Sequence, residues 1–163
     1  MEKKISREEA EKQVVLLAKR CALLYQSFAE VLVEELGEDK GREIAARAIE
    51  KYGTRCGSQV RKGVEGQGLD LTLPNYFAVP DLPSMGWVTE QKALKDEELE
   101  VDVLYCPLAE QWLEEGKASL GRLYCYVDQA KFSAYNPEYQ CVHRKNVLDG
   151  DDKCTFHVTK KKK

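Results

Sequence analysis

The chain has 163 residues, of which 43% are hydrophobic and 33% are charged, a balance typical of one globular domain with its own core. Its 25 basic and 28 acidic residues are mixed along the sequence, which argues against a nucleic-acid surface. No apolar run approaches the roughly 20 residues that cross a bilayer, and the start MEKKISREEAEKQ lacks the apolar core of a signal peptide. We therefore expect a single cytoplasmic domain over residues 1–163, with reduced cysteines, no membrane partner and a solvated lysine tail at about 160–163.

A long amphipathic helix is predicted at the start of the chain. Ser6 and Glu9 form a capping box, and apolar residues at spacings of three and four continue to Leu36, where Gly37 stops the helix. Cys21 lies on this apolar stripe, so we expect it in the core. The same stripe is a candidate contact for a homo-oligomer.

A second helix is predicted from about Glu38 to Lys62. Gly53 and Gly57 interrupt it four residues apart, and glycine inside a helix costs about 1 kcal/mol relative to alanine. Two glycines on one face therefore predict a close backbone contact. Arg55, between them, is a candidate to bind a carboxylate, although a solvated arginine is the ordinary interpretation.

In the second half of the chain the sequence predicts short helices between two β-hairpins. Residues 63–83 hold three glycines and three prolines, a long loop typical of a lid or a binding loop. The elements expected after it are strands at 85–92 and 98–106, a short helix opened by Pro107, a helix at 119–127, a helical turn capped by Asp128, and strands at 138–148 and 153–159 around Asp149-Gly150. The fold class is α+β, with two N-terminal helices packed on an antiparallel sheet of about four strands.

The cysteines of the second half are the main candidates for chemistry. A nucleophilic cysteine among Cys106, Cys125 and Cys154 would need a base such as His143 or His157 and an orienting carboxylate such as Asp128. A metal site, for zinc or iron, would take its ligands from Cys106, Cys125, Cys154 and His157. Structural, buried cysteines are the third interpretation, and the spacing does not choose among them. On a flat strand the side chains of Cys154 and His157 face opposite sides, which counts against a shared site.

Several short motifs resemble one known family, in order and in spacing. They are KYGTRCG at 51–57, CP at 106–107, GRLYCYVD at 121–128, YNP at 135–137 and GDDKCTF at 150–156. Together they resemble the L-2-amino-thiazoline-4-carboxylic acid hydrolase family, over roughly residues 40–159. The resemblance implies a fold similar to the 4-vinyl reductase domain, which binds small molecules.

The resemblance also implies an activity and a set of site residues. The activity is ring opening of a cyclic amidine in a thiazoline carboxylate to N-carbamoyl-cysteine, which we expect to be hydrolysis of a non-peptide C–N bond. Cys106 and Cys125 match family motifs and are expected to be reactive or ligating, with Asp128 as proton acceptor or orienter. Arg55, Tyr135 and Asn136 are expected to contact the substrate. The alternative is a non-catalytic module that binds a small molecule or a metal.

Overall fold

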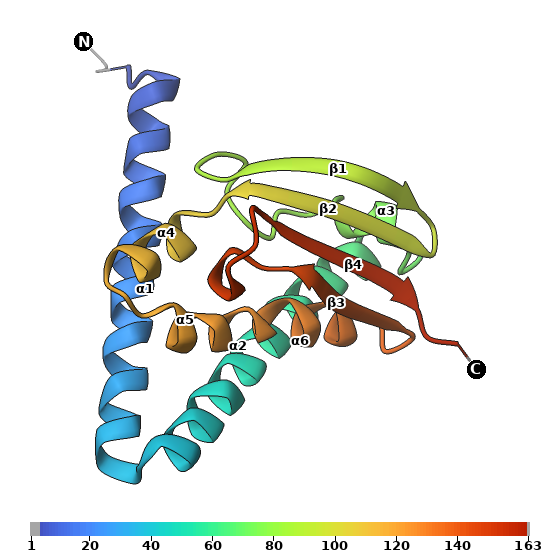
Figure 1. The fold of residues 1–163 in the computed structure, drawn as a ribbon. Coiled ribbons are helices and arrows are strands. Elements are labelled where there is room, and N and C mark those ends of the chain that lie inside the picture. Colours follow the sequence, from blue (N-terminus) through green and yellow to red (C-terminus); the bar gives the residue numbers. More distant parts are fainter. Residues whose placement is uncertain (1–3, 163) are drawn as a thin grey trace.

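Two long helices pack beside a four-stranded antiparallel sheet in the computed structural model, which describes residues 4–162 (Figure 1). α1 (Arg7–Leu36) is capped by Ser6, whose hydroxyl accepts a bond from the Glu9 N–H, and α2 (Glu38–Gly66) follows after Gly37. Gly37 has φ 79°, a conformation that glycine adopts without strain. None of the helices described is long and apolar enough to cross a bilayer. The predicted α+β class and the turn between the two helices are confirmed.

The sheet has the strand order β1-β2-β4-β3. Its strands are β1 (Val88–Lys95), β2 (Glu98–Tyr105), β3 (Tyr139–Lys145) and β4 (Cys154–Lys160). β1 pairs with β2 and β3 with β4, so both predicted hairpins are present, and an antiparallel β2–β4 pair joins them.

Short helices connect these elements and lie on one side of the sheet (Figure 1). They are α3 (Leu73–Tyr76), α4 (Pro107–Glu114), α5 (Ala118–Tyr124), α6 (Tyr126–Tyr135) and the 3₁₀ turn η1 (Val147–Asp149). One core cluster lies between the sheet and α2, α3 and α6, where Val64, Leu99 and Val158 are completely buried. A second cluster joins α1, α4 and η1 around Trp112. Because α6 packs against both α2 and β3, its side chains are candidates for a site between helices and sheet.

The two glycines of α2 mark its crossing with α6. A Cβ at Gly53 would lie 2.5 Å from the Val127 carbonyl oxygen, and one at Gly57 would overlap the Lys131 carbonyl group. The close backbone contact predicted from the sequence is therefore confirmed, and α6 is the element that makes it.

Gly57→Ala is expected to destabilise the protein by roughly 1–3 kcal/mol, because α6 must move to accommodate the methyl group. Gly66→Ala is the matched control, since a Cβ at this last residue of α2 meets nothing within 4 Å. It should change stability by less than about 1 kcal/mol, in the stabilising direction. Urea unfolding followed by circular dichroism measures both, and equal effects at the two glycines would contradict the close crossing.

Several predicted boundaries were wrong. α2 continues to Gly66 and α3 lies inside the expected loop, so the irregular segments are shorter than the predicted 63–83 stretch. β1 is Val88–Lys95 rather than the predicted 85–92, and the first hairpin turns at residues 96–97. α6 begins at Tyr126, which places Asp128 in its first turn and not at its cap. In the second hairpin, Asp149 ends η1 within a longer loop.

Two further expectations fail at the ends of the chain. Cys21 is exposed on α1 rather than buried in the core. Lys160 is the last residue of β4, and the Lys161 backbone N–H donates to the Glu138 carbonyl oxygen at 2.7 Å. The first residues of the expected solvated tail are therefore hydrogen-bonded to the rest of the protein. Lys163 lies outside the described residues.

Candidate functional site

A histidine–carboxylate pair lies between α6 and the sheet. Along β3, Tyr139, Cys141 and His143 face the helices, while Gln140 and Val142 between them are exposed. His143 Nε2 lies 3.2 Å from Asp128 Oδ2, and the histidine side chain is only 4% exposed. Of the two histidines proposed as a base, His143 is therefore the one that lies within hydrogen-bond distance of the predicted carboxylate, Asp128.

The other nitrogen of the His143 ring has no hydrogen-bond partner. An ionised carboxylate only accepts, so the Nε2 atom facing Asp128 carries a proton, and in the neutral form of the ring Nδ1 is the nitrogen with the free lone pair. Nδ1 is buried and unpaired within residues 4–162. Buried polar atoms normally find a partner, and an unpaired basic nitrogen here marks a point where a ligand or water can donate.

A buried lysine continues this polar network towards the loop after α2. Lys131 Nζ lies 2.7 Å from Asp81 Oδ2 and 3.6 Å from Asp128 Oδ1, and Asp81 also accepts a bond from the Tyr76 hydroxyl at 2.7 Å. Burial alone would raise the pKa of Asp128, but the bond from His143 and the charge of Lys131 outweigh it, so the pKa is lowered. Burial likewise opposes the charge of Lys131, but the two aspartates hold the pKa of this lysine above its ordinary value.

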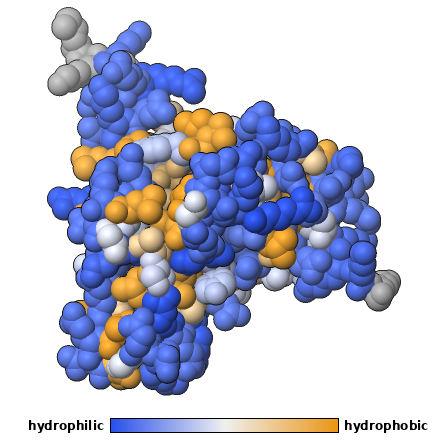
Figure 2. Space-filling view, viewed as in Figure 1, coloured by the Kyte–Doolittle hydropathy of each residue, from blue (hydrophilic) through white to orange (hydrophobic). Residues whose placement is uncertain are grey.

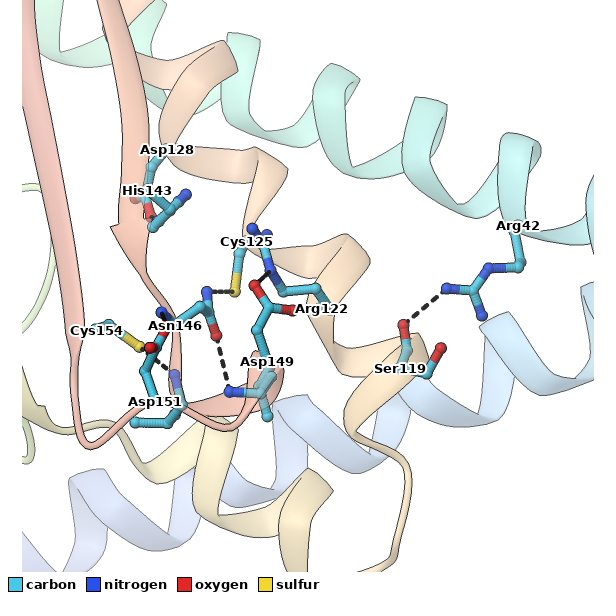
Figure 3. Close-up of polar contacts among 12 residues, drawn as sticks. Arg42, Ser119, Arg122, Cys125, Asp128, His143, Asn146, Asp149, Asp151 and Cys154 are labelled. Atoms are coloured by element: carbon cyan, nitrogen blue, oxygen red, sulfur yellow. Dashed lines mark hydrogen bonds and ion pairs between the residues drawn. The ribbon is translucent and has the colours of Figure 1, made fainter.

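Two cysteines lie beside this network, near the loop between β3 and β4. Asn146 Nδ2 donates to Cys125 Sγ at 3.4 Å, and the Val147 N–H donates to Cys154 Sγ at 3.4 Å (Figure 3). Burial raises the pKa of Cys125 to about 12, against the effect of the Asn146 bond, and the negative charge of Asp128 adds to the rise. Burial also raises the pKa of Cys154.

Cys106 precedes α4, and there too burial is the largest effect. It raises the pKa of the thiol, although the backbone N–H groups of Leu108 and Ala109 at the start of α4 act in the opposite direction. Desolvation of the Cys106 thiol therefore outweighs the effect of the N–H groups at the helix start, which favour the thiolate. Cys106, Cys125 and Cys154 are all thiols at neutral pH in this structure.

The three residues expected to contact substrate have other neighbours. Tyr135 is fully buried and its hydroxyl donates to the Thr72 carbonyl oxygen at 2.7 Å, while Asn136 Nδ2 donates to the Leu71 carbonyl oxygen at 3.0 Å. Both side chains thus connect the end of α6 to the loop before α3 through hydrogen bonds. Arg55 is exposed on α2. A substrate-binding role for these three residues stays a prediction.

The proposed metal ligands are not assembled into a site. Within residues 4–162, no three His, Cys, Asp or Glu side chains are grouped closely enough to hold a metal ion. His157 lies on the outer face of the sheet, 3.2 Å from Glu98 Oε1 and 2.7 Å from the Arg144 guanidinium, as the alternation from Cys154 predicted.

Lys131, Asp81 and Asn146 were not identified from the sequence. Lys131 follows Asp128 by three residues on one helix, which is a usable signal. Asp81 and Asn146 lie in loops, and no local pattern connects them to α6. A surface hollow of about 660 Å³ between α2 and α6 is lined by Arg47 and other residues, but not by Asp128 or His143.

Comparison with known proteins gives a fold neighbour and a family. A crystal structure of trafficking protein particle complex subunit 3 from Naegleria fowleri, covalently bound to palmitic acid, is similar with a TM-score of 0.56 and 15% identity, covering 90% of this chain and 96% of that one. At this identity the likeness concerns the fold alone. No curated protein matches the chain. The family model for L-2-amino-thiazoline-4-carboxylic acid hydrolase matches residues 15–158, nearly the whole length, and the chain belongs to this family.

Proposed function

We propose that this chain hydrolyses a small cyclic amidine that carries a carboxylate, as in the ring opening of 2-amino-thiazoline-4-carboxylate for which its family is named. The observation that carries the proposal is the contact of Asp128 with the buried His143 side chain, whose Nδ1 is unpaired within residues 4–162. A histidine held by a carboxylate through one ring nitrogen can accept a proton through the other. Amidine hydrolysis needs such a group, because water that adds to the amidine carbon must lose a proton.

The product determines which bond breaks. His143 Nδ1 takes a proton from water as the water oxygen bonds to the amidine carbon, and Asp128 stabilises the imidazolium that forms. The imidazolium then returns the proton to the leaving ring atom. N-carbamoyl-cysteine arises only when the bond from the amidine carbon to the ring sulfur breaks, which releases a thiol. Breaking the ring C–N bond, as expected from the sequence, would instead give the S-carbamoyl isomer.

Lys131 is the cation best placed to hold the substrate carboxylate. It is 8% exposed, and its Nζ lies 3.6 Å from Asp128 Oδ1, so a carboxylate bound to it would lie beside the proton-transfer pair. Asp81 supplies a carboxylate to Lys131 in this structure. We infer that the substrate carboxylate replaces Asp81, which requires the loop that carries Asp81 to move. Arg55, exposed on α2, is the alternative cation.

Water is the nucleophile that the thiol pKa values favour. With a pKa of about 12, Cys125 would be a thiolate in only about one molecule in 10⁴ at pH 8. Direct attack by Cys125 or Cys106 therefore requires prior transfer of the thiol proton to a base. These two thiols are the alternative nucleophiles.

The test is incubation of the purified protein with 2-amino-thiazoline-4-carboxylate and detection of N-carbamoyl-cysteine by chromatography with mass spectrometry. We expect turnover by the wild type and by Cys125→Ala, with Cys21→Ala, altered at an exposed cysteine on α1, as the control. Loss of turnover in folded Cys125→Ala alone would assign the attack to this thiol. Stabilisation by the compound without product would contradict hydrolysis and favour a binding module.

A further inference from the structure

One face of α1 carries large apolar side chains that its own protomer leaves uncovered. The residues of α1 that are buried against the body of the molecule are Ala18, Ala22, Gln26 and Ala29, and the Trp112 indole N–H donates to the Ala22 carbonyl oxygen at 3.1 Å. Leu17 and Phe28, by contrast, are 65% and 66% exposed. Figure 2 shows separate apolar patches among hydrophilic ones on the side of the molecule where α1 lies. A row of such residues along one helix marks an interaction surface rather than scattered exposure.

The uncovered residues follow a heptad pattern. We define the α1 seam as Leu17, Cys21, Leu24, Phe28 and Val31, all of which are exposed. Successive members are alternately four and three residues apart, which keeps them on one stripe of the helix over two heptads. An alternating four-three stripe is complementary to another helix with the same stripe. The heptad spacing therefore favours a helix over an irregular partner.

The charges beside the seam select a second copy of this chain as that helix. Arg20 and Glu34 are two heptads apart and flank the seam on the same side, and neither forms an ion pair within residues 4–162. In an antiparallel pair with two-fold symmetry, Arg20 of each helix meets Glu34 of the partner subunit. The same alignment places Leu24 opposite Phe28 of the partner subunit. A parallel pair would place like charges at the same level.

We propose that the protein forms a two-fold symmetric dimer in which the α1 seams of two copies pack antiparallel. The contact covers Leu24, Phe28 and Val31 of both copies and leaves the Asp128–His143 site outside the interface, because that site lies on α6 and β3, which are not among the elements packed on α1. The proposal is independent of the hydrolytic activity. It also explains why α1 carries a wider apolar surface than its contacts with α2, α4 and α5 cover.

Sedimentation equilibrium over a range of protein concentrations tests the dimer. Phe28→Glu is expected to raise the dissociation constant at least about 30-fold, because it places a charge at the centre of the seam. The matched control is Val142→Glu, since Val142 is 46% exposed on β3, a strand that is not among the elements packed on α1. It should leave the dissociation constant unchanged. A wild type that stays monomeric at every concentration, or a dimer that Phe28→Glu leaves intact, would overturn the proposal.

Charge reversal tests the orientation. Arg20→Glu and Glu34→Arg should each weaken the dimer, and the double variant should restore it, since the exchanged charges meet again in an antiparallel pair. Failure of the double variant to recover would overturn the antiparallel arrangement. A monomeric protein that instead co-sediments with phosphatidylcholine vesicles would overturn the dimer by assigning the seam to a membrane surface.

Discussion

His143→Gln is expected to lower the rate of thiazoline ring opening by about 100- to 10,000-fold, the range typical of removing a general acid–base group. Glutamine retains a donor for Asp128 but has no nitrogen that accepts a proton at neutral pH. The expected loss is therefore in kcat rather than in KM. Asp128→Asn should cause a loss of similar size, because the amide no longer fixes the histidine with Nδ1 unprotonated. Steady-state kinetics with product detection by chromatography measures both.

The chain supplies a matched control for this experiment. His157 and Glu98 form a second histidine–carboxylate pair with the same 3.2 Å separation, on the outer face of the sheet. Glutamine at either position should leave kcat within about twofold of wild type. Equal losses at His143 and His157 would indicate that the variants perturb the sheet rather than the chemistry, and would remove the main support for the proposed activity.

The elements predicted correctly from the sequence are those whose boundaries are marked by residues close together in the chain. Ser6 with Glu9, Gly37 and Pro107 mark helix boundaries through contacts within a few residues, and all of these boundaries are present in the structure. The positions of Gly53 and Gly57 identified a close helix crossing, since glycine inside a helix needs a reason. The helix boundaries and the glycine positions depend on residues that are neighbours in the sequence, so they can be predicted without knowledge of the fold.

The site depends on contacts between distant segments. Asp128 and His143 meet only because α6 packs across β3, and Asp81 reaches Lys131 from a loop 50 residues earlier in the chain. No periodicity encodes such pairings. The exposure of Cys21 was missed for a related reason. The apolar stripe of α1 is wider than the surface that the protomer covers, and the sequence alone does not tell which part of the stripe is covered.

Lys131→Met is expected to destabilise the protein by about 3–5 kcal/mol at neutral pH, because removing one partner leaves buried carboxylates without a counter-charge. Two aspartates share this lysine, which is 8% exposed. The control is Lys117→Met. Lys117 is 43% exposed and pairs with one carboxylate, Glu30, at 2.6 Å, so its loss should cost at most about 1 kcal/mol. Chemical unfolding at pH 7 compares the two variants.

The pH dependence identifies the cause of this destabilisation. In the wild type the pKa of Asp128 is lowered, so its contribution to stability is present above the unfolded pKa, about 3.9, and is lost as pH falls through the folded pKa. Without the lysine charge, burial would act on Asp128 with less opposition and raise its pKa. The stability difference between wild type and Lys131→Met should therefore shrink as the pH is lowered from 7 to 4. A difference that stays constant over this range would mean that Lys131 contributes through packing of its aliphatic chain and not through its charge.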